Sequence, residues 1–252
     1  MDVKGLAALV TGGASGMGAV TGRALAAAGA KVAFLDVNQA AAEAVAADVG
    51  GLGLGCDVTD AAAAEAAVAK ARQAHGPARI LVNCAGVAPA KRIVGRDGPM
   101  PLADFQKVVS INLIGSFNML RLAAADMTAA EPLNDDGERG IIISTASVAA
   151  FDGQVGQVAY AASKAGIIGM MLPAAREFAR FGVRVLTIAP GLIGTPMLLN
   201  MPQEVQDNLA GQVPFPKRFG KAEEYAALVM HLCANPMLNG ETIRLDGAMR
   251  RQ

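Results

Sequence analysis

The stretch "LAALVTGGASGMGAVTGRALAAAG" (residues 6–29) joins an apolar run to a glycine cluster and then to an alanine-rich segment. The run has the composition of a buried strand and alanine favours helices, so we expect a strand, a tight turn and a helix. Gly12, Gly16 and Gly18 follow the spacing G-x-x-x-G-x-G. Backbone without side chains can approach a pyrophosphate, and a helix N-terminus offers unpaired N–H groups to bind it. The alternative is a plain tight turn.

Further apolar runs of strand length alternate with helix-like stretches along the whole chain. They cover residues 31–36, 79–86, 140–147, 182–191 and 241–247. Because these runs are continuously apolar, both of their faces should be buried, as in a parallel sheet. The strand–helix alternation predicts an α/β fold with a doubly wound parallel sheet and right-handed crossovers. No linker divides the sequence, so we expect residues 1–252 to form a single domain.

Two segments interrupt this alternation. Residues 88–104 are basic and rich in proline and glycine, and residues 191–220 mix Met, Leu, Phe and Pro. Each follows the carboxyl end of a predicted strand, which is where open α/β sheets bind their ligands. We interpret both as substrate-loop insertions and the second as an apolar lid. The alternative for the second segment is an ordered surface excursion.

The composition excludes several classes of protein. Hydrophobic residues make up 53% of the chain, enough for a sizeable core, and 22 basic residues balance 22 acidic ones. No overall field therefore favours nucleic acid or an anionic membrane, and no apolar run is long enough to span a bilayer. The three cysteines are scattered, so we expect neither disulfides nor a metal site. With no secretory signal visible, we expect a cytoplasmic protein.

Asp36 ends the second predicted strand, 18 residues after Gly18. A carboxylate at this place can accept hydrogen bonds from both hydroxyls of an adenosine ribose, and it would repel a 2′-phosphate. The next residue is Val37 rather than an arginine. The sequence therefore predicts NAD(H) in preference to NADP(H). The alternative is an aspartate that caps the following helix.

The stretch "AYAASKAG" (residues 159–166) holds one of only two tyrosines in the chain. Tyr160 and Lys164 are four residues apart, so on a helix both side chains emerge on one face. An ammonium roughly 5 Å from a phenol, at an effective dielectric of about 20, gives about 3 kcal/mol, or about two pKa units. Such a pair is suited to acid–base chemistry. The alternative is a surface contact.

Ordered motifs over nearly the whole chain give it a resemblance to the classical short-chain dehydrogenase/reductase family. The motifs are "TGGASGMG" (11–18), Asp57-Val58, "NCAG" (83–86), Asn112, Ser147, Tyr160-x-x-x-Lys164, and Pro190-Gly191 with Thr195. The resemblance implies a Rossmann-like fold. Cys84 is a departure, because the family usually has asparagine there; that stretch is mainly structural, so the chemistry should be unaffected.

The resemblance implies four catalytic residues: Asn112, Ser147, Tyr160 and Lys164. Tyr160 is the expected acid/base, and Lys164 also holds the nicotinamide ribose. Ser147, thirteen residues before Tyr160, is expected to hydrogen-bond the substrate oxygen. Asn112 interrupts a helix-like apolar run and is expected to relay protons through a water to Lys164; the alternative is a buried asparagine bonded to backbone.

The resemblance also assigns binding positions. Cofactor-binding positions are Gly12, Ser15, Gly16, Met17, Gly18, Asp36, Asp57, Val58, Asn83, Ala85, Gly86, Tyr160, Lys164, Pro190, Gly191, Ile193 and Thr195. Substrate-contacting positions are Ser147, Gln154, Gln157 and Tyr160.

A narrower likeness rests on four further stretches: "STASVAAFDGQVGQVAY" (144–160), "TIAPGLIGTPML" (187–198), "QVPFPKRFG" (212–220) and "NGETIRLDGAMR" (239–250). They resemble the short-chain (type 2) 3-hydroxyacyl-CoA dehydrogenases, also called 17β-hydroxysteroid dehydrogenases type 10. This implies NAD-dependent interconversion of 3-hydroxyacyl-CoA and 3-ketoacyl-CoA in fatty acid metabolism, and a homotetramer.

Several alternatives stay open at this point. Within the same class they are a steroid or secondary-alcohol dehydrogenase and a 3-ketoacyl-carrier-protein reductase, the latter disfavoured by Asp36. In another class is a non-catalytic nucleotide-binding scaffold, although such proteins usually lose the tyrosine or the lysine. Lys91, Arg92 and Arg96 are either contacts for the phosphates of coenzyme A or a solvated charged loop.

Overall fold

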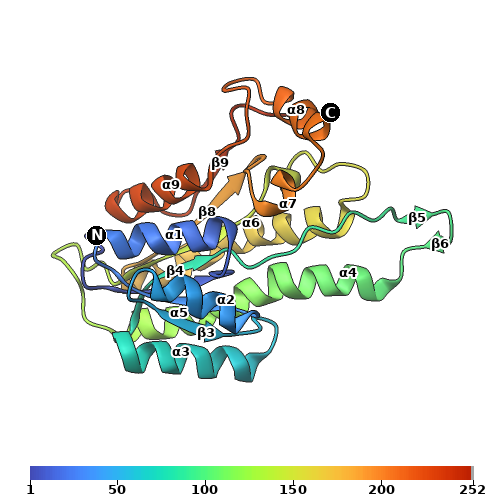
Figure 1. Ribbon diagram of the computed structural model, residues 1–252. Coiled ribbons are helices and arrows are strands. Elements are labelled where there is room, and N and C mark those ends of the chain that lie inside the picture. The colour runs from blue at the N-terminus through green and yellow to red at the C-terminus, as the bar shows by residue number, and fades with distance from the viewer. Residues whose placement is uncertain (251–252) are drawn as a thin grey trace.

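Seven parallel strands form one sheet at the centre of the computed structural model, which describes residues 1–250 (Figure 1). Their order across the sheet is β3-β2-β1-β4-β7-β8-β9. The strands are β1 (Ala7–Thr11), β2 (Lys31–Asp36), β3 (Leu52–Gly55), β4 (Ala78–Asn83), β7 (Gly140–Thr145), β8 (Val183–Pro190) and β9 (Thr242–Leu245). The order reverses between β1 and β4, which is the place where doubly wound sheets form a ligand crevice. The predicted α/β fold class is confirmed.

Helices connect consecutive strands. They are α1 (Gly16–Ala27), α2 (Gln39–Ala47), α3 (Ala61–His75), α4 (Leu102–Val109), α5 (Gly115–Ala129), α6 (Val158–Phe178), α7 (Pro196–Leu199), α8 (Gln203–Gly211) and α9 (Ala222–Ala234). Strand β3 is absent from the sequence-based assignment. Its four residues are Leu-Gly-Leu-Gly, too short and too rich in glycine to give a strand pattern.

The side chains of the strands alternate between two apolar layers. On one face Leu9 and Leu81 pack with α3, α5 and α6. On the other face Val10 and Val82 pack with α1, α2 and α9. Figure 1 shows α9 and α3 on opposite sides of the sheet. Burial on both faces explains why the strand sequences are apolar without a gap.

Two glycines allow the turn after β1 to fold back on itself. A Cβ built on Gly18 would lie 2.2 Å from the carbonyl oxygen of Gly12, and one built on Gly12 would lie 2.9 Å from the amide nitrogen of Ala85. Gly12 also has a φ of 62°, in the left-handed region that favours glycine. No larger residue fits either place without a shift of the backbone.

Two helical stretches are long and apolar enough, by length and composition, to cross a membrane: Leu102–Ala129 and Val158–Phe181. This corrects the expectation that no run reaches that length, since glycines and charges within both stretches are tolerated in one continuous helix. The first stretch joins α4 to α5 through a π-helix, η1 (Ser110–Ile114). Both stretches pack against the sheet, and helices in a protein core commonly have this length and composition.

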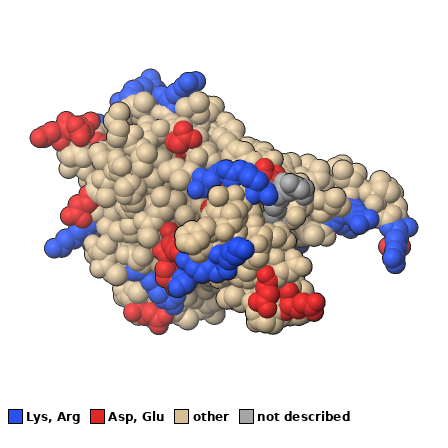
Figure 2. Space-filling view, turned by 90° about the horizontal axis from the view of Figure 1, so that it is seen from above, with Lys and Arg blue, Asp and Glu red and all other residues tan. Residues whose placement is uncertain are grey.

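Each of the two predicted insertions contains short helices or strands that are not part of the seven-stranded sheet. Residues 88–104 contain an arm whose strands β5 (Val94–Gly95) and β6 (Gly98–Pro99) pair only with each other. The arm extends away from the sheet, and basic side chains gather on it (Figures 1 and 2). Residues 191–220 contain α7 and α8 and lie over the carboxyl end of β8.

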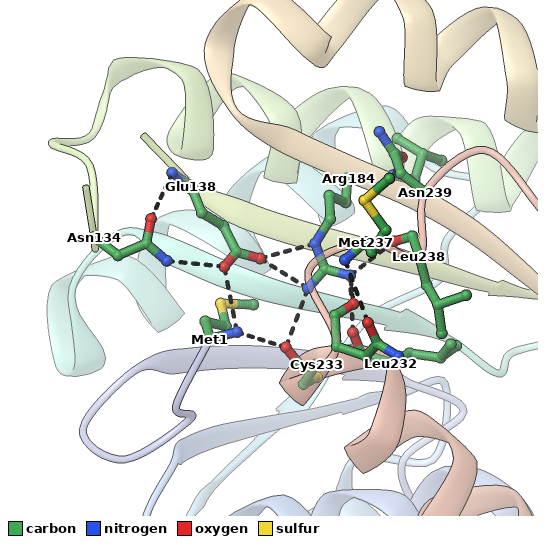
Figure 3. A network of polar contacts seen from close by, with 11 residues as sticks. Met1, Asn134, Glu138, Arg184, Leu232, Cys233, Met237, Leu238 and Asn239 are labelled. Carbon is green, nitrogen blue, oxygen red and sulfur yellow. Dashed lines mark hydrogen bonds and ion pairs between the residues drawn. The ribbon is translucent and has the colours of Figure 1, made fainter. Parts of the chain in front are cut away.

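A buried polar network fixes the other end of β8 (Figure 3). Arg184 is 6% exposed and forms an ion pair with Glu138, 5% exposed, at 2.8 Å. The Arg184 guanidinium also donates to the carbonyls of Leu232 and Cys233, in the last turn of α9. Glu138 further accepts the ammonium of Met1 at 3.2 Å. One arginine therefore joins β8 to the end of α9 and neutralises a buried carboxylate.

We expect Arg184→Gln to lower the free energy of unfolding by about 3–5 kcal/mol, because Glu138 would lose its main buried partner and several carbonyls their donor. Urea unfolding measured at neutral pH tests this. The matched control is Arg23→Gln, since Arg23 pairs with Asp48 where both side chains are about half exposed. That change should cost less than about 1 kcal/mol, and equal losses in the two variants would contradict the expectation.

Candidate active site

A cavity of about 650 Å³ lies at the carboxyl ends of β1, β2 and β4, beside the reversal of strand order. The turn after β1 forms one wall, and the segment that follows β4 forms another. The N-terminus of α1 points into this region, and Ser15, its N-cap residue, makes no side-chain cap hydrogen bond. The predicted cofactor-binding residues in the walls are Gly12, Ser15, Gly16, Met17, Gly18, Asp36, Asp57, Val58, Ala85, Gly86 and Thr195.

Asp36 links the end of β2 to the glycine turn. Its Oδ2 accepts a hydrogen bond from the Ala14 amide at 3.1 Å, and its Oδ1 accepts from the Asn38 amide at 3.0 Å. The cap of α2 is Asn38, whose side chain accepts from the Ala41 amide. The structure thus gives the helix-capping role to Asn38 and leaves Asp36 in the cavity wall beside Val37.

A second cavity, of about 260 Å³, adjoins the first, and the two share wall residues that include Cys84, Gly86 and Val87. It brings together residues from four distant parts of the chain. The predicted residues in its walls are Met17, Gly86, Ser147, Gln157, Tyr160, Lys164, Pro190, Gly191, Ile193 and Thr195. Leu192 and Leu198 also line it, so the segment 191–220 contributes apolar wall to this cavity.

Ser147 lies where β7 passes into a 3-10 turn, η2 (Val148–Ala150). Its backbone is extended, and its Oγ accepts a hydrogen bond from the Ala149 amide at 3.1 Å. The hydroxyl hydrogen is therefore available for a group in the cavity. Ser144 is buried on the strand and bonds the Asn83 side chain, which leaves Ser147 as the serine that reaches the cavity.

Lys164 lies one helical turn after Tyr160 on α6, as the spacing predicts. Its ammonium is 5.8 Å from the centre of the Tyr160 ring and donates to the carbonyl of Thr145 at 2.6 Å. Burial lowers the pKa of Lys164 to about 8. An ammonium with so little water around it acts strongly on nearby groups, because the local dielectric is low.

Asn112 lies in the π-helix η1 and is fully buried. Its side chain accepts from the Val87 amide, donates to the Val87 carbonyl and donates to Ser163 Oγ, all at 2.8–2.9 Å. A Cβ built on Gly86 would lie 3.2 Å from Asn112 Oδ1 and 3.5 Å from Lys164 Nζ, so the three residues converge. The side chain has the backbone bonds of the alternative interpretation. The relay through Lys164 stays a prediction.

Three predicted residues, Asn83, Asn112 and Gln154, do not line either cavity. Asn83 is 2% exposed, and its amide donates to the Ser116 carbonyl and to Ser144 Oγ. It supports the floor between β4 and β7. Gln154 lies in an exposed loop, where its backbone N–H donates to the side-chain oxygen of Gln157. Any contact between Gln154 and a substrate stays a prediction.

Sequence reasoning missed two features of the walls. Lys107 on α4 lines the larger cavity, and a charged residue inside an amphipathic helix gives no signal of such a role. Cys84 lines both cavities, and its Sγ lies 3.7 Å from the hydroxyl of Tyr225, which in turn lies 2.7 Å from Thr145 Oγ1. Burial raises the pKa of the Cys84 thiol, so it stays protonated at neutral pH.

The larger cavity fits a dinucleotide. Its walls combine a helix N-terminus, a backbone turn whose glycines leave no room for a Cβ, and a carboxylate at the end of the second strand. These are the groups that bind a pyrophosphate and an adenosine ribose. The smaller cavity continues from it and holds a tyrosine, a lysine and a serine around one space. Together they can bind a redox cofactor and move a proton beside it.

Comparison with known proteins agrees with this geometry. The family model described as "short chain dehydrogenase" matches residues 6–206. The chain is 50% identical to "3-hydroxyacyl-CoA dehydrogenase type-2" of Homo sapiens over 255 residues, covering 100% of this chain and 97% of the other. The Bos taurus protein of that name is 50% identical over 258 residues, with the same coverage.

A solved structure agrees as well. The crystal structure of 3-hydroxyacyl-CoA dehydrogenase type-2 from Mycobacterium avium is 41% identical and superposes with a TM-score of 0.94, covering 98% of this chain and 97% of that one. A family match over most of the chain and relatives of this identity along its full length establish the family. The chain therefore belongs to the short-chain dehydrogenases, enzymes that work with NAD or NADP.

Proposed function

We propose that this enzyme interconverts 3-hydroxyacyl-CoA and 3-ketoacyl-CoA with NAD(H) as the cofactor. The observation that carries the proposal is the cavity that holds Ser147, Tyr160 and Lys164 and adjoins the dinucleotide-sized cavity. The choice of substrate is supported by relatives named 3-hydroxyacyl-CoA dehydrogenase type-2 that match along their whole length.

The residues of the smaller cavity divide the chemistry among them. When bound, NADH supplies the hydride and NAD⁺ accepts it. In the reducing direction, the Tyr160 hydroxyl donates its proton to the oxygen of the 3-keto group, and in the oxidising direction the phenolate accepts the proton of the 3-hydroxyl. The Ser147 hydroxyl donates a hydrogen bond to the same oxygen and stabilises charge there. The Lys164 ammonium stabilises the phenolate, which favours proton release at neutral pH.

The preference for NAD(H) is supported by Asp36. Its carboxylate is held by the Ala14 and Asn38 amides and lies in the cavity wall, and the neighbouring Val37 is 74% exposed. The extra phosphate of NADP(H) would meet this negative charge, and unfavourable contact between like charges costs several kcal/mol.

Space for an acyl-CoA is available beside the arm. A third cavity, of about 650 Å³, lies at the base of the arm and shares Gly86 and Val87 with both other cavities. Lys91 and Asp104 form an ion pair in its wall. Arg92 and Arg96 are exposed further out on the arm. The substrate would thus extend from the smaller cavity toward a basic surface, which suits a thioester carrying phosphates.

We further propose a homotetramer and a cytoplasmic location. Exposed apolar side chains support the assembly: Ile114 and Phe117 on the stretch from η1 to α5 and Leu172 on α6 are 39–52% exposed. Faces of this kind are commonly buried between subunits. Light scattering in solution gives the mass of the assembly directly, to be compared with the 25.6 kDa chain.

Reduction of acetoacetyl-CoA should be efficient with NADH, and kcat/KM should be about a hundredfold lower with NADPH, because Asp36 repels the 2′-phosphate. Initial rates monitored by absorbance of the reduced cofactor measure both values. A steroid ketone and a simple ketoester serve as comparison substrates. Preference for NADPH would contradict the role of Asp36, and turnover of the steroid alone would favour a steroid dehydrogenase.

Tyr160→Phe should lower kcat by about 10²–10⁴ while the Kd for NADH stays nearly normal, because only the proton donor is lost. Single-turnover rates and fluorescence titration measure the two quantities. Tyr225→Phe is the matched control, since it removes the only other tyrosine hydroxyl, which is fully buried between α9 and the sheet. Substantial activity retained in Tyr160→Phe would remove Tyr160 from the acid/base role.

Replacing Lys91, Arg92 and Arg96 together with glutamine should raise the KM for acetoacetyl-CoA about tenfold, since each exposed contact with a phosphate contributes a fraction of a kcal/mol. The KM for a small secondary alcohol should not change. A control variant replaces Lys31, Lys70 and Arg176, three exposed cations away from the arm, and alters net charge equally. Equal effects on both substrates would show that the arm is only a solvated loop.

A further inference from the structure

A cluster of polar contacts outside the cavities joins the C-terminal segment to the turn that follows Ser147. Arg244, on β9, donates from Nη2 to Asp152 Oδ2 at 2.8 Å and from Nε to Asp246 Oδ2 at 2.7 Å. Its guanidinium also lies 5.0 Å from the centre of the Phe151 ring. The planar fork of an arginine is suited to such a combination of two carboxylates and an aromatic face.

The partners of Arg244 on one side belong to the turn that carries Ser147. Phe151 and Asp152 come directly after the 3-10 turn η2, and Ser147 is the cap of that turn through its bond from the Ala149 amide. Amides of the turn also tie its two ends together, since those of Phe151 and Asp152 both donate to the Val148 carbonyl. A contact that holds Asp152 in place therefore also restricts the direction in which the Ser147 hydroxyl points.

The partners on the other side belong to the C-terminal segment, residues 244–250. Arg244 Nη2 donates to the Met249 carbonyl at 2.9 Å, and the Met249 side chain is 1% exposed, packed with Val148, Leu192 and Val213. Val148 follows Ser147, and the other two belong to the segment 191–220.

The same segment also closes on the turn after β8. The Gly191 amide donates to the Leu245 carbonyl at 2.9 Å. A Cβ built on Gly191 would lie 2.9 Å from Asp246 Cα, so the two backbones are in tight contact. The C-terminal segment thus contacts two parts of the chain that bound the smaller cavity, the turn after Ser147 and the segment after β8.

We propose that Arg244 is a positioning residue: its guanidinium holds the turn after Ser147 against the C-terminal segment and so keeps the Ser147 hydroxyl aimed at the substrate oxygen. Among the described residues, Arg244 lines neither the larger nor the smaller cavity. It therefore acts through Asp152 and the turn. Supporting contacts of this kind keep reacting groups within about 0.5 Å of their productive place. The inference rests on the proposed role of Ser147.

The test replaces Arg244 with glutamine and measures kcat, KM and the Kd for NADH separately. We expect kcat with acetoacetyl-CoA to fall about ten- to hundredfold, as for a small displacement of a reacting group. The Kd for NADH should stay within about twofold, because Asp36 and the glycine turn lie at other strand ends. Arg244→Lys keeps the charge and should recover part of the lost kcat.

Arg250→Gln is the matched control. Arg250 donates to Asp246 Oδ2 at 3.1 Å and to the Met249 carbonyl at 2.7 Å, two acceptors that Arg244 also uses. Asp152 is not among its hydrogen-bond partners within residues 1–250. Its loss should leave kcat near the wild-type value. If Arg250→Gln lowers kcat as much as Arg244→Gln does, the link to the turn is not the cause and the inference is wrong.

Asp152→Asn removes the same ion pair from the other side with no change in volume, and it should lower kcat as Arg244→Gln does. Hydrogen exchange of residues 147–152 gives a readout independent of activity, with faster exchange expected in both variants. Unchanged exchange and kcat, or parallel losses of kcat, NADH affinity and melting temperature, would overturn the proposal. If the wild-type protein does not reduce acetoacetyl-CoA, the proposed function fails, and the exchange data still decide whether Arg244 holds the turn.

Discussion

The close contact between the ends of β1 and β4 sets the geometry on which both cavities depend. Thr11 Oγ1 accepts hydrogen bonds from the amides of Cys84 and Ala85, each at 3.1 Å, and Gly12 lies directly against Ala85. Because these backbones touch, the glycine turn lies beside the segment after β4 and a single crevice opens between them. The two cavities are therefore consequences of one strand pairing, completed by α6 and residues 191–220.

Within that crevice, the burial of Lys164 strengthens the interaction of its charge with neighbouring groups. The ammonium donates a hydrogen bond to the Thr145 carbonyl, and desolvation lowers its pKa to about 8. A cation in such surroundings has a high free energy that nearby hydroxyl or phenolate oxygens can lower. The small residues of "AYAASKAG" leave Tyr160 and Lys164 open to the cavity, where a bound cofactor and a substrate can provide these oxygens. The proposed proton transfer thus depends on the exclusion of water from this face of α6.

The local patterns of the sequence predicted much of this, and long-range contacts account for what they did not. The glycine spacing, the apolar runs and the Tyr160–Lys164 pair are features of neighbouring residues, and the structure places them as expected. The partners of Asn112 and the ion pair between Arg184 and Glu138 join residues that are far apart in the chain. No local pattern marks such pairs, because each residue alone is an ordinary polar one. Strand β3 was missed for a different reason. Its alternate residues are glycines, which have no side chains to give a strand pattern.

The arm of residues 88–104 contributes little to the stability of the fold. Its two short strands pair only with each other, and Ile93 and Val94 are more than 60% exposed. The sheet, by contrast, is held by the Arg184 network at the start of β8 and by the glycine turn at the end of β1. Changes in the length or charge of the arm therefore carry little folding cost, while they alter the surroundings of the cavity at its base. The fold therefore provides a region whose sequence can change while the sheet, and the cavity walls built on its strand ends, stay in place.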